Sequence, residues 1–100
     1  MKQEIKTIEV QAKMHLDSGN TYFSARIYKD GELFKVLPFQ YGYGEQYLYE
    51  TGKALGLNDD TPLWRHCADN SIELIHSADY KTGGGYSERH LKEWAKMEAE

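Results

Sequence analysis

The sequence has little of several features that mark particular classes of protein. It contains one cysteine, Cys67, so no disulfide can form within the chain. No apolar run approaches the roughly 20 residues that a membrane-spanning helix needs. The first residues, Met1–Lys6, lack the apolar segment of a secretory signal. These absences predict a cytoplasmic protein that does not enter membranes.

Positive charge is also scarce. Lysine and arginine number 12 against 16 aspartates and glutamates, which gives a net charge of −4. Proteins that bind nucleic acids through their phosphates usually carry a basic excess, so we do not expect direct nucleic-acid binding.

Clusters that could perform chemistry are missing as well. His66 and Cys67 are adjacent, and on a helix such neighbours point about 100° apart, so they rarely share a metal ion. No pair of carboxylates and no nucleophile–base pattern stands out along the chain. We expect no enzyme activity, no cofactor and no metal site.

Tyrosine, by contrast, is abundant. There are 8 tyrosines in 100 residues, and aromatic residues make up 13% of the chain. A tyrosine side chain combines a large apolar ring with a polar tip, which suits contact surfaces and also suits the thin core of a small domain. The length allows a single domain, residues 1–100.

The first forty residues show the alternation of β-strands. Apolar residues recur at every second position over 8–14 and again over 21–28. Asp30-Gly31 is a strong hairpin signal, and a third strand over 33–37 follows it. Pro38 either ends this strand or places it at a sheet edge. This pattern predicts an antiparallel meander of three strands.

Helical spacing follows in the middle of the chain. Apolar residues at intervals of three and four predict a helix over 45–55 that covers one face of the sheet, with Gly56 ending it in a Schellman motif. A short helix is expected over 63–68, with Thr61 as its N-cap.

The rest of the chain predicts a fourth strand over 71–76 and a terminal helix over 88–97. Ser87 is the expected N-cap of that helix, which should pack through Leu91 and Trp94. The fold class is therefore α+β: a three-stranded antiparallel meander, a helix, a short helix, a fourth strand and a C-terminal helix. The predicted core residues are Val10, Phe23, Ile27, Leu48 and Leu55.

A loop rich in tyrosine and glycine is the candidate contact surface. Gly42 and Gly44 allow positive φ or a close backbone approach within Gln40–Gly44. Tyrosine offers large contact area at low entropy cost, and a carboxylate can pair with an arginine or lysine of a partner. The predicted partner-binding residues are Tyr41, Tyr43, Glu45 and Tyr47. The same side chains can instead lock the third strand to the helix.

One face of the second strand is an alternative site. Arginine and aromatic residues on a sheet face can stack nucleic-acid bases, which predicts a nucleic-acid surface here. The same face can instead be an ordinary solvent face with cross-strand pairs. The residues concerned are Lys13, Tyr22, Arg26 and Tyr28.

One stretch of the first half resembles a group of small proteins encoded by phages and prophages. The residues that carry the resemblance are Gly19–Tyr22, Arg26–Tyr28, Asp30-Gly31 and Pro38–Tyr47. The resemblance covers residues 8–57, whereas the second half, from Asn58, resembles nothing we recognise. The group has no assigned chemistry, so no residue takes a catalytic role from it.

The resemblance implies a setting, namely a phage accessory protein in the cytoplasm of a bacterial host. Small acidic phage proteins often inhibit host machinery by occupying a surface, and anti-CRISPR proteins are among them. The implied partner is a host protein or nucleoprotein complex, and the implied function is the inhibition of a bacterial defence system. The alternative is a nucleic-acid-binding accessory protein, and a homodimer is left open.

Overall fold

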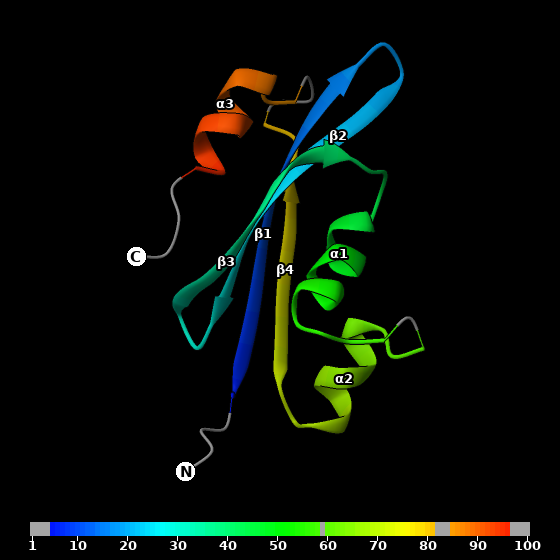
Figure 1. Ribbon diagram of the computed structural model, residues 1–100, viewed down its shortest axis with the longest axis vertical. Helices are drawn as coiled ribbons and strands as arrows, with labels where there is room; N and C mark the ends of the chain where they lie inside the picture. Colours follow the sequence, from blue (N-terminus) through cyan, green and yellow to red (C-terminus); the bar gives the residue numbers. More distant parts are fainter. Residues whose placement is uncertain (1–4, 59, 82–84, 97–100) are drawn as a thin grey trace.

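A mixed four-stranded sheet organises the chain in the computed structural model, which describes residues 5–58, 60–81 and 85–96 (Figure 1). The strands lie in the order β3-β2-β1-β4. The predicted α+β class and element order are confirmed. The elements are β1 (Thr7–Asp17), β2 (Asn20–Lys29), β3 (Glu32–Tyr41), α1 (Gln46–Ala54), α2 (Leu63–Asp69), β4 (Glu73–Asp79) and α3 (Glu88–Trp94).

Two tight hairpins connect the antiparallel strands β1, β2 and β3. Ser18 and Gly19 have φ of 51° and 85°, and Asp30 and Gly31 have φ of 50° and 87°. Positive φ at both central residues is the type I′ conformation, whose twist matches that of the flanking strands. The hairpin predicted at Asp30-Gly31 is therefore confirmed.

Strand β3 continues through Pro38 and forms one edge of the sheet. Of the two alternatives for Pro38, the edge position is the correct one, because an edge strand can lack a backbone N–H on its open side. The register against β2 shifts between Phe23 and Ala25, opposite the Pro38 region, so the irregularity accommodates the proline.

Strand β4 pairs with β1 in parallel, which makes the sheet mixed. It was expected over 71–76 and is found two to three residues later. The N–H of Glu73 donates to the carbonyl of Lys6 at 2.9 Å and begins the ladder. As expected, Ile72, Leu74 and His76 share one face, which is the face of α1 and α2.

The predicted cap at the end of α1 is confirmed, whereas the predicted cap at the start of α2 is not. Gly56, at φ 84°, and Leu57 return hydrogen bonds to Lys53 and Gly52, which is the predicted Schellman motif. The prediction of Thr61 as N-cap of α2 is wrong. Pro62 occupies that position, because its ψ of 156° makes it the last non-helical residue.

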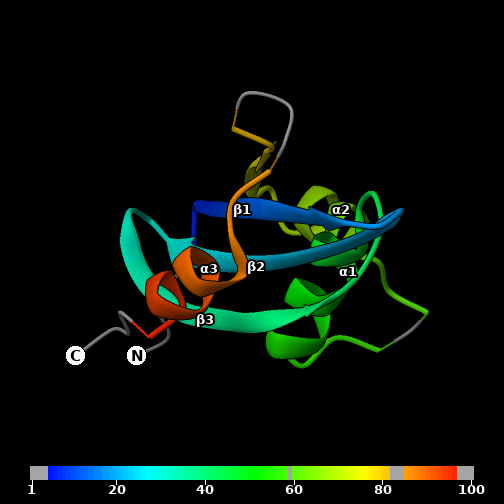
Figure 2. The ribbon, with the colours of Figure 1, turned by 90° about the horizontal axis from the view of Figure 1, so that it is seen from above.

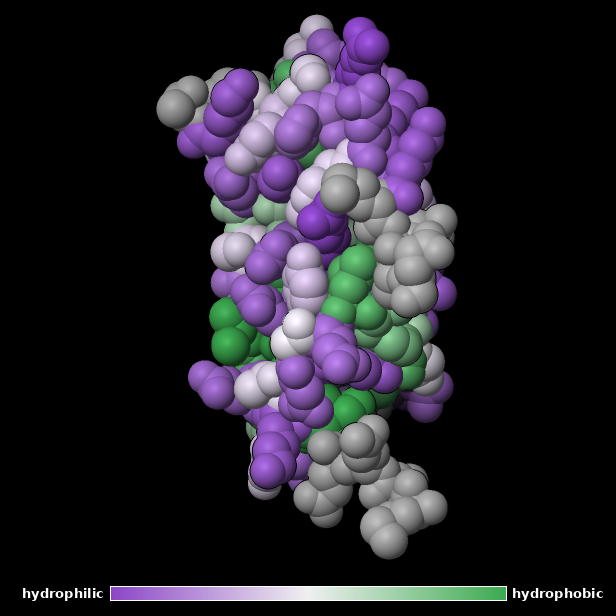
Figure 3. All heavy atoms as spheres, turned by 90° about the vertical axis from the view of Figure 1, so that its left-hand side faces the viewer, coloured by the Kyte–Doolittle hydropathy of each residue, from purple (hydrophilic) through white to green (hydrophobic). Residues whose placement is uncertain are grey.

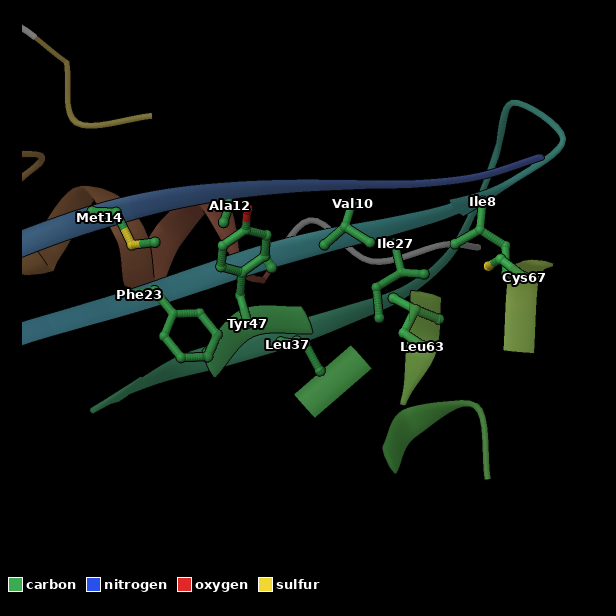
Figure 4. Close-up of a cluster of buried hydrophobic side chains, with 11 residues drawn as sticks. Ile8, Val10, Ala12, Met14, Phe23, Ile27, Leu37, Tyr47, Leu63 and Cys67 are labelled. Atoms are coloured by element: carbon green, nitrogen blue, oxygen red, sulfur yellow. The ribbon is translucent and has the colours of Figure 1, made fainter. Parts of the chain in front are cut away.

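The main core lies between the sheet and the pair α1 and α2 (Figure 4). Val10, Phe23 and Ile27 are fully buried, as predicted. Leu48 and Leu55 are only partly buried, because α1 turns Tyr47 and Thr51 inward instead. The other core residues are Ile8, Ala12, Met14, Ala25, Leu37, Leu63 and Cys67.

Helix α3 lies on the opposite face of the sheet from α1 and α2 (Figure 2). Leu91 and Trp94 are its buried residues, as predicted. The Ser87 hydroxyl accepts a hydrogen bond from the N–H of His90 at 3.1 Å, which confirms the expected cap. The helix ends at Trp94, with Ala95 as its C-cap, which is earlier than the predicted end near residue 97; residue 97 itself lies outside the described residues.

Candidate functional site

A continuous set of aromatic rings lies on the α3 side of the sheet, at the end of β3. The rings of Tyr22 and Phe39 stack at 5.3 Å, and Tyr41 meets Tyr22 edge-on at 5.5 Å. Tyr43 in turn meets Tyr41 edge-on at 5.2 Å. His15 lies 5.8 Å from Tyr22. We call these five residues the tyrosine patch.

The outer members of the patch are open to solvent. The exposed fractions of Tyr41 and Tyr43 are 54% and 51%, whereas Tyr22, Phe39 and His15 behind them are half-buried. The half-buried ring of Tyr22 meets Tyr41 edge-on, and Tyr41 in turn meets Tyr43, which are geometries that aromatic pairs prefer. The patch therefore presents two rigid phenols. The side of the molecule that carries β3 and α3 is otherwise largely hydrophilic, with separate hydrophobic patches (Figure 3).

The loop requires glycine at positions 42 and 44 for different structural reasons. A Cβ on Gly42 would lie 2.6 Å from a ring carbon of Phe23 and 2.7 Å from Cγ of Gln46, so only glycine lets the loop approach the core. Gly44 instead has φ of 54°, the left-handed conformation that glycine adopts most easily. Both expectations for this loop are met, one by each glycine.

Hydrogen bonds fix the phenols of the patch. The Tyr43 hydroxyl lies 3.2 Å from the carbonyl of Gly19 and 3.3 Å from Oδ1 of Asn20, and so bridges to the β1–β2 hairpin. Hydrogen bonding with Tyr43 raises the pKa of Tyr41 above its ordinary value, and partial desolvation adds to this. Tyr41 is therefore neutral at physiological pH, and its hydroxyl can both donate and accept hydrogen bonds.

Tyr47 does not belong to this surface, and its prediction as a partner-binding residue is wrong. Its exposed fraction is 3%, and it lies on the other side of the sheet, in the core (Figure 4). Its hydroxyl lies 3.0 Å from Nδ1 of His76. Burial raises the pKa of Tyr47, and the Glu45 carboxylate adds to this, so the phenol stays protonated and can donate to the imidazole. The residue is buried because α1 turns its 47 and 51 positions toward the sheet.

Glu45 is exposed, but it lines a cleft on the α1 side of the sheet. The four predicted residues therefore divide into two exposed tyrosines on one face, a buried tyrosine in the core and a carboxylate at a separate cleft. Of the predicted contact surface, Tyr41 and Tyr43 remain together.

Helix α3 covers the cations of the alternative nucleic-acid surface. The ammonium of Lys13 and the guanidinium of Arg26 each lie 4.6 Å from the centre of the Trp94 ring. Arg26 also donates to the carbonyl of Trp94 at 3.2 Å. Tyr22 is engaged in the tyrosine patch, and Tyr28 is half-buried farther along β2. The structure therefore does not support a nucleic-acid surface on this face.

A group of polar contacts fastens the segment before α3 to the sheet. The Tyr86 hydroxyl donates to Oδ2 of Asp79 at 2.6 Å, and the N–H of Lys81 donates to the same carboxylate. These two hydrogen bonds lower the pKa of Asp79, and the charge of Lys13 adds to the effect. Burial, followed by repulsion from Arg26, lowers the pKa of Lys13.

The cysteine and the histidines form no reactive cluster in the described part of the chain. Cys67 is buried in the core, and desolvation raises its pKa, which keeps the thiol protonated and unreactive. Within the residues that the structure describes, no group of three histidine, cysteine or acidic side chains could hold a metal ion.

The sequence analysis missed a cleft between α1, α2 and β4. Its volume is about 310 Å³, and the indole of Trp64, 66% exposed, stands at its rim. The one signal available was a tryptophan on the outer side of a seven-residue helix whose buried positions are Leu63 and Cys67. Nothing in the sequence brings that tryptophan beside β4.

The chain was compared with protein-family models, with curated proteins and with solved structures, and it matches none of them. Among the described helices, none is long and apolar enough to cross a bilayer.

Proposed function

We propose that this chain is a non-enzymatic binding protein that occupies a surface of a larger bacterial protein or nucleoprotein complex, with the tyrosine patch as its contact surface. The observation that carries the proposal is the pair of solvent-exposed phenols, Tyr41 and Tyr43, of which Tyr41 packs on the ring of Tyr22 and Tyr43 is hydrogen-bonded to the β1–β2 hairpin. Tyrosine is enriched at protein interfaces because a fixed ring gives contact area at little entropic cost.

The biological role belongs to the same proposal. The resemblance of residues 8–57 to phage-encoded proteins suggests that the bound complex is a host defence system and that binding inhibits it. Inhibition by occupancy needs a stable scaffold and a few aromatic anchors, and no catalytic group.

The aromatic contacts also stabilise the sheet, as cross-strand aromatic pairs do. The experiment must therefore separate loss of binding from loss of folding. Tyr41 suits this purpose because its ring is the more exposed of the two and packs against Tyr22 and Tyr43, which are not core residues.

The test is capture of a partner from bacterial lysate by the tagged protein, followed by infection of a defence-positive strain that expresses the protein. We expect the wild type to capture a complex and to raise the plating of a restricted phage. Tyr41→Ala with Tyr43→Phe should lose both effects, while the protein stays folded and its melting temperature falls by only about 5–10 °C.

The matched control is Phe34→Ala, which removes a 40% exposed aromatic ring near the opposite end of β3. It should behave as the wild type. Equal capture by the patch variant and the wild type would show that the patch is structural. If expression of the protein leaves the plating efficiency of the phage unchanged in every defence-positive strain, the inhibitor role is ruled out.

A further inference from the structure

The cleft on the α1 side is apolar in its interior and has an aromatic rim. Leu48, Leu57, Leu63 and Leu74 line it, and Tyr49 and Trp64 stand at its edge. Its volume of about 310 Å³ lies at the lower end of the range of ligand pockets, roughly 300–1,000 Å³. A cleft of this size suits one large apolar side chain rather than a whole cofactor.

Strand β4 is an edge strand of the sheet and lies on the side of α1 and α2 (Figure 1). Its residues Leu74 and His76 line the cleft. The N–H of Glu73 points toward β1, and backbone direction alternates along a strand, so Ile75 and Ser77 point the same way. The N–H and C=O groups of Leu74, His76 and Ala78 therefore point outward, where the described chain places no strand. Five of the seven residues of β4 are exposed, which agrees with an uncovered edge.

Two of the three outward-facing residues of β4 also line the cleft. Leu74 and His76 turn their side chains to the α1 and α2 side and form part of its wall. A strand added to this edge would hydrogen-bond to their backbone, and its alternate side chains would project to the same side. Peptide recognition by strand addition combines these two elements, with main-chain hydrogen bonds for affinity and a pocket for specificity.

The charge around the cleft favours a basic occupant. The Glu45 carboxylate lines the cleft and makes no ion pair with any described residue, whereas Lys53 has its charge offset by Glu50 at 3.9 Å. Glu73, at the start of β4, is exposed as well. The net charge of −4 reinforces this preference.

We infer that the β4 edge and the cleft together bind an extended basic peptide segment, which adds as a strand to β4 and inserts one large apolar side chain beside Trp64. This site lies on the opposite face of the sheet from the tyrosine patch, and it does not depend on the function proposed for that patch.

The test is binding of fluorescein-labelled synthetic peptides measured by fluorescence anisotropy. The reference peptide alternates threonine and valine, with tryptophan at its centre and lysine at both ends. We expect the reference peptide to bind measurably. Replacing its central tryptophan by alanine should weaken the affinity at least about tenfold, because the substitution removes the central anchor. Replacing the terminal lysines by glutamates should also weaken it.

Two N-methylated peptides test strand addition itself. Methyl groups on one alternate set of peptide nitrogens face β4 and should abolish binding, whereas methyl groups on the other set face solvent and should leave binding within about threefold. Equal affinities of the two methylated peptides would overturn the proposal. A second copy of the chain paired at β4, detected by sedimentation, would overturn it too, as would the absence of binding by every peptide.

The protein variants are chosen from exposed side chains so that folding is preserved. Trp64→Ala should weaken the reference peptide about tenfold, and Glu45→Gln should weaken it mainly at low salt. Phe34→Ala is the matched control and should bind as the wild type does, because its 40% exposed ring lies on β3, at the opposite edge of the sheet from β4. Unchanged binding by Trp64→Ala would place the peptide elsewhere and overturn the assignment.

Discussion

The two faces of the sheet are built on different principles. The face under α1 and α2 is lined by alternating apolar residues that are almost completely buried. The face under α3 is held by a buried leucine and by contacts between cations, rings and carboxylates around Trp94 and Tyr86. Burial is the dominant stabilising term on the first face, whereas specific pairings add modest increments on the second.

The largest expected effect tests this contrast directly. Phe23→Ala should lower the free energy of unfolding by about 3–5 kcal/mol, because its ring is fully buried beneath α1 and would leave a cavity. Leu91→Ala, on the α3 face, should cost about 2 kcal/mol, at the low end for a buried leucine, since a seven-residue helix can settle onto the gap. Urea titrations followed by far-ultraviolet circular dichroism measure both values.

Leu16→Ala is the control for these two variants. Its side chain is 40% exposed at the end of β1, so it should cost under about 1 kcal/mol. If Leu91→Ala costs as much as Phe23→Ala, the α3 face is a second full core and the contrast fails.

The same contrast explains what the sequence predicts well. A period of two identifies the buried face of a strand without any knowledge of its neighbours, and Val10, Phe23 and Ile27 followed it. Turn chemistry at Asp30-Gly31 and the cap at Ser87 are equally local. These features depend only on residues within a few positions of one another.

The features that were missed depend on segments far apart in the chain. Strand β4 selects β1 as a parallel partner across more than sixty positions, and no local pattern encodes that choice. Helix α3 reaches back to cover Lys13 and Arg26, so a cationic surface that looked open in the sequence is occupied. The cleft beside Trp64 exists only because α2 and β4 meet.

For the candidate site, the sequence predicted which residue types gather in the loop but not which side of the sheet each one takes. Tyr41 and Tyr43 belong to an exposed patch, whereas Tyr47 begins the inner face of α1. A helix rotated by one residue, about 100°, would exchange Tyr47 with Leu48 in the core. Periodicity alone could not choose between them, because both side chains are large and apolar enough to be buried.

A smaller effect measures the pairings on the α3 face. Lys13 lies over the Trp94 ring at 4.6 Å and is half-buried, so the coupling energy of this pair should be about 0.5–2 kcal/mol. A double-mutant cycle with Lys13→Met and Trp94→Leu isolates it.

Lys53 and Tyr49 are the control pair for this cycle. They face each other on α1 at the longer distance of 5.5 Å, and both are exposed. Their coupling should therefore be smaller than that of Lys13 and Trp94. A coupling of zero for the Lys13–Trp94 pair would mean that this contact between cation and ring does not help to hold α3.

The last and smallest effect is a dependence on pH that belongs to the α3 face. The hydrogen bond from Tyr86, together with that from the Lys81 N–H, lowers the pKa of Asp79. A carboxyl whose pKa is lower in the folded state stabilises the fold fully above its unfolded pKa, about 3.9, and loses that contribution as the pH falls through the folded value. The stability difference between the wild type and Asp79→Asn should therefore be constant near neutrality and shrink below about pH 4.

Direct titration of the Asp79 carboxyl by NMR checks the cause. In Tyr86→Phe, which keeps the ring and removes the donor, its pKa should rise toward the ordinary value. An unchanged pKa in that variant would show that the carboxylate is stabilised by the backbone and by Lys13 instead, and that Tyr86 holds this face through its ring.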